Sequence, residues 1–202
     1  MSLRHAPLLG SGVSAIVAEY GQPSLLASPP QFGSISLSNA TSATATITSV
    51  DPTNSLLFLL GENTAGTSSD GYWTIRLAFT NATMITATRQ ASDGVVQRDV
   101  YFVVIPLKPG VAKSITRGTI SLNGVTSAAA TLSPGVDITR SVVTPLGFEI
   151  NNVGAGSIND KFPRIVLTNT TTVTATCSVS IATTYTVGYQ VLELFSVAMI
   201  CE

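Results

Sequence analysis

Polar and apolar residues alternate along much of this chain, with the period of two that is typical of β-strands. Residues 43–50 alternate strictly, with threonines between small or apolar side chains, and residues 72–80 repeat the pattern with larger side chains. Residues 55–61 are a continuous apolar run, which is typical of a strand buried on both faces or in the centre of a sandwich. The pattern predicts an all-β chain without helices.

Turn-forming residues (Gly, Ser, Asn, Asp and Pro) separate these stretches and set the expected element bounds. In the first half of the chain, strands are expected at residues 34–38, 43–50, 55–61, 72–80, 83–89 and 95–107. In the second half, they are expected at residues 118–123, 127–133, 141–150, 162–168, 171–179 and 184–196. Turns are expected at residues 51–54 and 91–94, and long loops at residues 62–71 and 151–160.

The same pattern of residues occurs twice in the chain. Asp51 matches Asp137 at an offset of 86 residues, and the offset drifts only between 85 and 88 along the chain. At the end of each copy, residues 101–104 align with residues 189–192 through a shared tyrosine. This period is too long for a solenoid repeat and fits a complete small domain, duplicated with short insertions.

The repeat divides the chain into domains. We expect two tandem β-sandwich domains of Ig-like or Greek-key topology, at residues 32–109 and 117–202, joined by a linker at residues 110–116. Residues 1–31 match neither copy and contain prolines and glycines between short apolar pieces. They are interpreted as an extended docking arm that orders upon assembly, with a flexible tail as the alternative.

The apolar residues of the arm are its candidate contacts with a partner protein, and they are Leu8, Leu9, Val13, Ile16, Leu25 and Leu26. The rest of the chain also suits burial against other proteins. Only 10% of the residues are charged, against about a quarter in ordinary soluble domains, and 45% are apolar. We therefore expect a subunit of an assembly. A secreted or periplasmic β protein with a neutral surface is the alternative.

Charge and hydropathy exclude two kinds of partner. The net charge is −1 and the Lys and Arg residues are scattered singly, so no nucleic-acid surface is expected. No apolar run approaches the roughly 20 residues that a membrane-spanning helix needs. The first residues lack the continuous hydrophobic segment of a secretory signal, so secretion by that route is not expected.

Cysteines and glycosylation motifs add little. Cys177 and Cys201 are too few for a disulfide framework, and free buried thiols are favoured over a bridge between them. Asn-x-Thr motifs begin at Asn39, Asn81 and Asn169, and the last two precede matched threonine-rich strands. Turn chemistry explains these two asparagines without glycosylation.

Residues for catalysis are not evident in the sequence. His5 is the single histidine, which removes a Ser-His-Asp triad within the domains and any multi-histidine metal site. The acidic residues lie mostly in turns, and the matched pair Asp51 and Asp137 is interpreted as a turn feature. We expect no enzyme activity, no catalytic or metal-binding residue and no cofactor.

Aromatic residues beside a loop offer one weak candidate for sugar binding. Tyr72 and Trp73 border the loop at residues 62–71, with Asp70 next to them. Trp73 also continues the alternating apolar pattern of its strand, and a place in the core is favoured over a sugar platform.

Several motifs are shared with a known family. Each copy contains Val-Asp-x-x-x-Ser before an apolar strand, followed by a Gly-containing loop and Arg-x-x-(Leu/Phe)-Thr-Asn-x-Thr. Over residues 33–196 the chain resembles the small β modules of tailed-bacteriophage virion proteins, most closely in the second copy. The first copy departs from the pattern at residues 103–106. The resemblance implies a component of the virion, assembled in the host cytoplasm.

Together these observations predict a non-enzymatic virion structural protein, and within that class a capsid decoration or cement protein. Its expected partners are the major capsid protein or another virion protein, and further copies of itself, with a trimer favoured. A tail or fibre component that binds host-surface glycan through the two long loops is the alternative. An accessory module of a secreted glycosidase is a third hypothesis.

Overall fold

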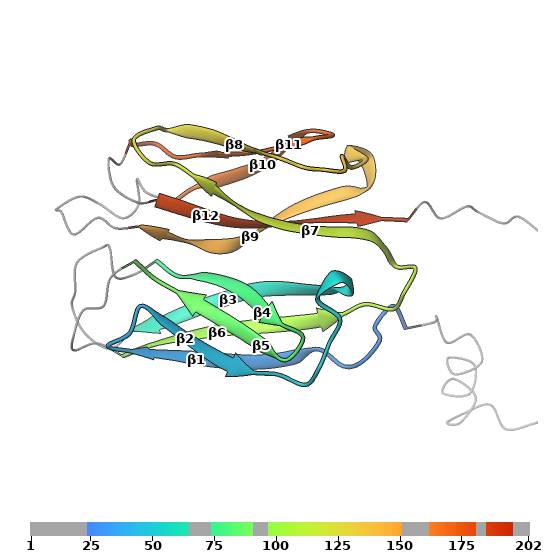
Figure 1. The fold of residues 1–202 in the computed structure, drawn as a ribbon, viewed down its shortest axis with the longest axis horizontal. Coiled ribbons are helices and arrows are strands. Elements are labelled where there is room, and N and C mark those ends of the chain that lie inside the picture. Colours follow the sequence, from blue (N-terminus) through green and yellow to red (C-terminus); the bar gives the residue numbers. More distant parts are fainter. Residues whose placement is uncertain (1–23, 65–73, 91–96, 151–161, 181–184, 196–202) are drawn as a thin grey trace, which may run out of the picture.

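The computed structural model describes residues 24–64, 74–90, 97–150, 162–180 and 185–195. These residues form an all-β structure with several antiparallel sheets (Figure 1). Helical structure within them is limited to two single 3-10 turns, Pro52–Asn54 and Ile138–Arg140. The expected all-β class is therefore confirmed. Whether the halves are two duplicated domains of Ig-like topology is a separate question, taken up below.

Residues 24–107, here the first half, contain two three-stranded sheets with the strand orders β1-β6-β3 and β2-β5-β4. The strands are β1 (Gln31–Ser38), β2 (Ser42–Thr46), β3 (Ser55–Thr64), β4 (Arg76–Asn81), β5 (Met84–Thr88) and β6 (Gln97–Pro106). The two sheets pack face to face around one cluster of buried side chains, to which β1, β3, β4, β5 and β6 all contribute. Alternate residues of each strand enter this cluster, as the sequence pattern predicts.

Residues 112–195, here the second half, repeat this arrangement. The strands are β7 (Ala112–Ser121), β8 (Ser127–Thr131), β9 (Ser141–Ile150), β10 (Arg164–Asn169), β11 (Thr172–Thr176) and β12 (Tyr185–Leu194). The strand orders are β7-β12-β9 and β10-β11-β8, which are the orders of the first half with six added to each number. A single pair, Arg76 with Gly147, links β4 to β9, so that one sheet continues from the first half into the second.

Three strands extend well beyond their predicted bounds. β1 begins at Gln31, before its predicted start at residue 34, because it pairs with β6 from there on, and the other two extend through polar residues. β3 continues to Thr64, into residues expected to begin a loop, because it stays paired with β6 after a bulge at Gly61. β7 begins at Ala112, inside the expected linker at residues 110–116, because it pairs with the end of β12. The side chains in these extensions are mostly polar, so the hydrophobic pattern of the sequence does not mark them as strands. Backbone hydrogen bonds to the neighbouring strand hold them in place. β3 is also not buried on both faces, since Leu60 is 54% exposed.

The predicted alignment of the two closing strands is wrong by one residue. Gly33 lies opposite Phe102 in the ladder, and its match Gly118 lies opposite Tyr189. A Cβ atom on either glycine would lie within 3.0 Å of that aromatic ring. Phe102 therefore matches Tyr189, and Tyr101 matches Gly188. The two tyrosines lie on opposite faces of their sheets, because a shift of one residue inverts every side chain of a strand.

The matched aspartates are turn residues, as predicted. The Asp51 carboxylate accepts a hydrogen bond from the Thr53 N–H at 2.9 Å, and Asp137 accepts from the Thr139 N–H at 2.9 Å. These hydrogen bonds, with those from the two threonine hydroxyls, lower the pKa of both carboxyls, that of Asp137 to about 2. Each aspartate thus caps a 3-10 turn that leads into a strand.

Two of the Asn-x-Thr motifs are also turn features. The Asn81 side chain accepts a hydrogen bond from the Thr83 N–H at 2.8 Å, and Asn169 does the same with Thr171 at 2.8 Å. The asparagines therefore close the tight turns between β4 and β5 and between β10 and β11.

Candidate interaction surfaces

Where the two halves meet, strand edges of the first half lie against the face of a sheet of the second half (Figure 1). The surface that the second half contributes is the outward face of the sheet β7-β12-β9, here called the second outer face. The first half contributes the edges of β3 and β4 together with the turn Pro52–Asn54, here called the first side. Matched surfaces exist elsewhere in the chain: the first outer face (β1-β6-β3) and the second side (β9, β10 and Ile138–Arg140).

A row of polar side chains crosses the second outer face. Arg117, Gln190 and Thr144 are neighbours on β7, β12 and β9. The buried Gln190 amide accepts a hydrogen bond from the Leu57 N–H at 3.3 Å and donates to the Leu57 carbonyl at 2.6 Å. It also donates to the Thr144 hydroxyl at 3.0 Å. One side chain therefore satisfies both backbone groups of Leu57 at the open edge of β3.

Arg117 connects the same face to the turn before β3. Its guanidinium donates to the carbonyl of Pro52 at 2.8 Å and also to the carbonyl of Ser55. It lies over the ring of Phe79 on β4, with 4.8 Å between the guanidinium carbon and the ring centroid. Burial lowers the pKa of Arg117 to about 10, which leaves the side chain charged at neutral pH.

The joint also contains an ion pair and a close approach of two backbones. Arg76 on β4 binds the Glu149 carboxylate through two nitrogens, at 2.9 and 3.0 Å. Gly147, with a φ of 90°, lies so close to β4 that a Cβ there would be 2.0 Å from the Ile75 carbonyl oxygen. Leu146 is only 3% exposed and belongs to the core cluster of the first half. The halves are thus held together by both polar and apolar contacts.

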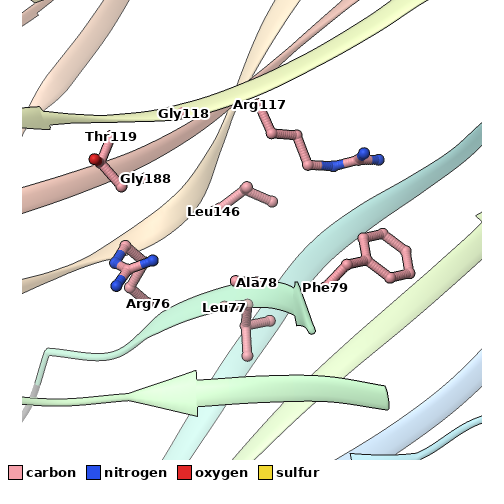
Figure 2. A pocket seen from close by; sticks show the side chains of 9 residues that line it. All are labelled: Arg76, Leu77, Ala78, Phe79, Arg117, Gly118, Thr119, Leu146 and Gly188. Atoms are coloured by element: carbon pink, nitrogen blue, oxygen red, sulfur yellow. The ribbon is translucent and has the colours of Figure 1, made fainter. Parts of the chain in front are cut away.

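A hollow of about 300 Å³ lies in this joint (Figure 2). Its lining residues come from β4, β7, β9 and β12 and are Arg76, Leu77, Ala78, Phe79, Arg117, Gly118, Thr119, Leu146 and Gly188. Figure 2 shows Arg76 and Arg117 on opposite sides, with Arg117 extended toward Phe79. Both arginines are already bonded, Arg76 to Glu149 and Arg117 to two carbonyls. The hollow is therefore part of the seam between the halves.

The first outer face has a different character from its match. The row in the place of Arg117, Gln190 and Thr144 consists of Phe32, Val103 and Phe58. Phe32 is 75% exposed, and Leu60 and Tyr101 on the same face are exposed as well. This contiguous apolar face was not predicted. The signal in the sequence was the alternation of β1. It places Phe32 on one face of the strand and the buried Ile35 and Leu37 on the other.

The last residues of the expected arm lie against the end of β6. Leu26 forms a bridge with Leu107, and the Ala27 N–H donates to the Pro106 carbonyl at 2.9 Å. The Lys108 N–H donates to the Leu25 carbonyl at 2.9 Å, while the Leu25 side chain is exposed. The other candidate contacts lie outside the described residues, namely Leu8, Leu9, Val13 and Ile16. The docking role of the arm stays a prediction.

The candidate sugar-binding residues Asp70, Tyr72 and Trp73 also lie outside the described residues. Of the strand predicted at residues 72–80, the structure shows β4 beginning at Arg76, with Ile75 and Leu77 buried. Most of the loop at residues 62–71 and the whole of that at residues 151–160 are outside as well, so glycan binding stays a hypothesis.

Among the described residues, no group of three or more His, Cys, Asp or Glu side chains is placed to hold a metal ion. Cys177 has a free, partly buried thiol whose pKa is raised by burial, and Cys201 lies outside the described residues. No helix in this part of the chain is long and apolar enough to cross a membrane.

A buried carboxylate distinguishes the end of the second half. Glu193 accepts hydrogen bonds from the Lys113 ammonium at 2.9 Å, from the Ser114 hydroxyl at 3.3 Å and from the Asp137 N–H at 3.0 Å. Burial acts to raise its pKa, but these partners outweigh burial and the pKa is lowered. The matched residue of the first half, Pro106, cannot make such a network.

Comparison with known proteins gives no relative for this chain. No family model, no curated protein and no solved structure matches it. The proposals that follow therefore rest on the fold, on the surfaces described above and on the motifs of the sequence.

Proposed function

We propose that the two halves are tandem Ig-like domains that arose by duplication. In an Ig domain, strands B, E and D pair in one sheet and C, F and G in the other. If β2 to β6 are taken as B to F, the order β2-β5-β4 is B-E-D, and β3-β6 is C-F. β1 then takes the place of G, since it pairs antiparallel with β6. The second half follows the same scheme, and the Asp51 and Asp137 turns recur at the same point.

We further propose that the chain is a non-enzymatic structural protein of a tailed-bacteriophage particle, located in the virion, and in particular a capsid decoration protein. The observation that carries this proposal is the attachment of residues 24–27 to the end of β6, beside the start of the second half. The arm therefore leaves a stiff two-sandwich body from a fixed point, with Leu25 exposed. Such a body with an apolar arm suits attachment to a repeating protein lattice.

The proposed mechanism is additive binding. The arm supplies apolar burial against the major capsid protein, and the low charge of the chain keeps the desolvation cost of the contact small. Because the decoration protein binds only the assembled shell, binding stabilises the shell relative to its free subunits. The sequence supports a non-catalytic role, since its single histidine is in the arm.

A tail or fibre component that binds host-surface glycan is the second candidate. One observation favours it: β3 and β9, which lead into the two long loops, end on the same side of the molecule (Figure 1). Loops that leave from one side of two rigidly joined sandwiches are suited to contacting one extended receptor.

The test is the copy number of this chain in purified particles of the virus that encodes it, measured by mass spectrometry against the major capsid protein. Hundreds of copies in a simple ratio to the capsid subunit would support decoration of the shell. A few copies, in multiples of three or six, would instead support a tail component. Absence of the chain from purified particles would overturn both virion proposals.

A further inference from the structure

We infer that a second copy of this chain binds the first outer face with its second side, in the same head-to-tail manner in which the second outer face binds the first side within one chain. This inference concerns contacts between copies and does not depend on a location in a virion. Positions that match between the two halves carry it, because they are covered in one half and exposed in the other.

Matched leucines show the difference most directly. Leu146 on the second outer face inserts into the core of the first half, whereas its match Leu60 on the first outer face is exposed. Both follow the same strand pattern and both precede a glycine. The first outer face therefore carries exposed apolar side chains at positions that a partner covers on the second outer face.

Matched glycines give a second, independent sign. Gly147 is required because the backbone of β4 passes at a distance that leaves no room for a side chain. At Gly61, its match, no atom of the described residues lies within 4 Å of a Cβ position, and the φ of 157° at the bulge favours glycine there without a neighbour. The chain thus keeps open, beside β3, the space that a neighbouring strand occupies beside β9.

The second side carries the groups that would fill this space. β4 pairs with β9 at Arg76, but its match β10 pairs only with β11 among the described strands. Arg164 on β10 is the match of Arg76. The second side also carries exposed apolar side chains: Phe162, 59% exposed although its ring edge meets Phe148, takes the place of Thr74, and Ile138 takes the place of Pro52.

Apolar residues replace polar ones on both proposed partners. Phe32 stands in the place of Arg117, which donates to the Pro52 carbonyl, and Phe162 stands in the place of Thr74, whose hydroxyl accepts from the Ile150 N–H. Tyr101 replaces Gly188, against which the stem of Arg76 packs, so the second contact is not an atom-for-atom copy. An arginine over a tyrosine ring is a favourable pair, which suits Arg164 to Tyr101. Both surfaces are thus complementary in chemistry.

A contact of this kind uses two different surfaces of each copy. Among the described residues of one chain, Phe32 and Leu60 on the first outer face and Phe162 and Ile138 on the second side stay exposed, so we assign their contact to a second copy. Each copy then offers a free first outer face and a free second side to further copies. Such heterologous contacts close into a ring or continue as a filament.

The experiment compares the full chain with two variants by sedimentation velocity over a wide range of concentration. Phe32→Asp/Leu60→Asp alters the first outer face, and Phe162→Asp alters the second side. Val125→Asp is the matched control, because Val125 is an exposed apolar residue in the turn between β7 and β8, away from both surfaces. Circular dichroism confirms that each variant is folded, and serine replaces aspartate in any variant that is not.

We expect the unaltered chain and the control to associate and each variant alone to stay monomeric. An equal mixture of the two variants should form a 1:1 dimer that does not grow, because one intact first outer face meets one intact second side. If the unaltered chain stayed monomeric at all concentrations, the inference would be overturned. The same result is expected if the arm of the same chain covers the first outer face. Undiminished association of either variant alone would also overturn it, since the contact would then use other surfaces.

Discussion

The two outer faces of this molecule are built from matching strands in the same order and register, but they differ in what covers them. In the row Arg117, Gln190 and Thr144, Gln190 is buried in the joint and its two neighbours are half-buried. The matched row begins at Phe32, which is 75% exposed, and its central residue Val103 is buried. The covered row is the polar one. A contact within one chain benefits from a very high effective concentration, so hydrogen bonds suffice to hold it. A contact between separate copies must offset a larger loss of freedom, for which apolar burial is better suited.

The comparison can be broken most severely at the matched glycines. Gly147→Ala should destabilise the protein by about 3 kcal/mol, because the new Cβ would collide with the Ile75 carbonyl and the backbone has a left-handed φ. Gly61→Ala should have a smaller effect, since that position shares the strain of a positive φ (157°) but no atom of the described residues crowds it. Calorimetric unfolding of both variants is the measurement. Equal losses of stability would contradict the view that the joint requires Gly147.

The polar row can be tested at its centre. Gln190→Leu leaves the N–H and carbonyl of Leu57 without their partner in the joint, which should reduce the free energy of unfolding by about 2 kcal/mol. The control is Phe58→Leu, which introduces the same residue at a half-buried position of the matched row and should change stability by less than about 1.5 kcal/mol. Urea unfolding measures both. A Gln190 variant as stable as the control would show that the amide contributes little.

Glu193 sharpens the comparison between the ends of the two halves. Its lowered pKa in the folded protein contributes stability that is present above the unfolded value of about 4.5 and is lost as pH falls through the folded value. Glu193→Gln should therefore weaken the fold by about 1.5 kcal/mol at neutral pH and reduce the acid-side dependence of stability. Unfolding midpoints measured between neutral and acid pH test this.

Asp137→Asn is the companion variant, because Asp137 also has a lowered pKa and hydrogen-bonds Glu193 through its backbone. Its effect on the acid-side dependence should add to that of Glu193→Gln, since asparagine keeps the cap of the 3-10 turn without the charge. An unchanged acid dependence in both variants would contradict the assignment of the acid-labile stability to this network.

Local patterns were enough to predict most strands. The alternation of small residues and threonines marks β5 and β11, and the Asp51 and Asp137 turns follow from residue type alone. The closing strands were misaligned because the identity of Tyr101 and Tyr189 outweighed their surroundings. Only the contact of each aromatic ring with a glycine on the neighbouring strand reveals the correct match.

The surfaces were harder to predict than the fold. Gln190 and Leu57 are 133 residues apart, and nothing in the local sequence of either indicates that an amide will complete a strand edge. Phe32 was hidden for the opposite reason, since an apolar residue in a strand is expected to be buried. Which face of a strand is covered by another part of the protein depends on how whole sheets pack. The residue type at a single position does not indicate this.

The bridge between Leu26 and Leu107 has a mechanical consequence. A pull on residues before Ser24 acts first on the hydrogen bonds to Pro106 and Lys108, which lie directly ahead of β7. Tension would therefore enter the molecule at the connection between its halves rather than at the end of β1. A force applied to the residues before Ser24 would therefore act on both halves at once, and neither half would have to unfold before the other bears the force.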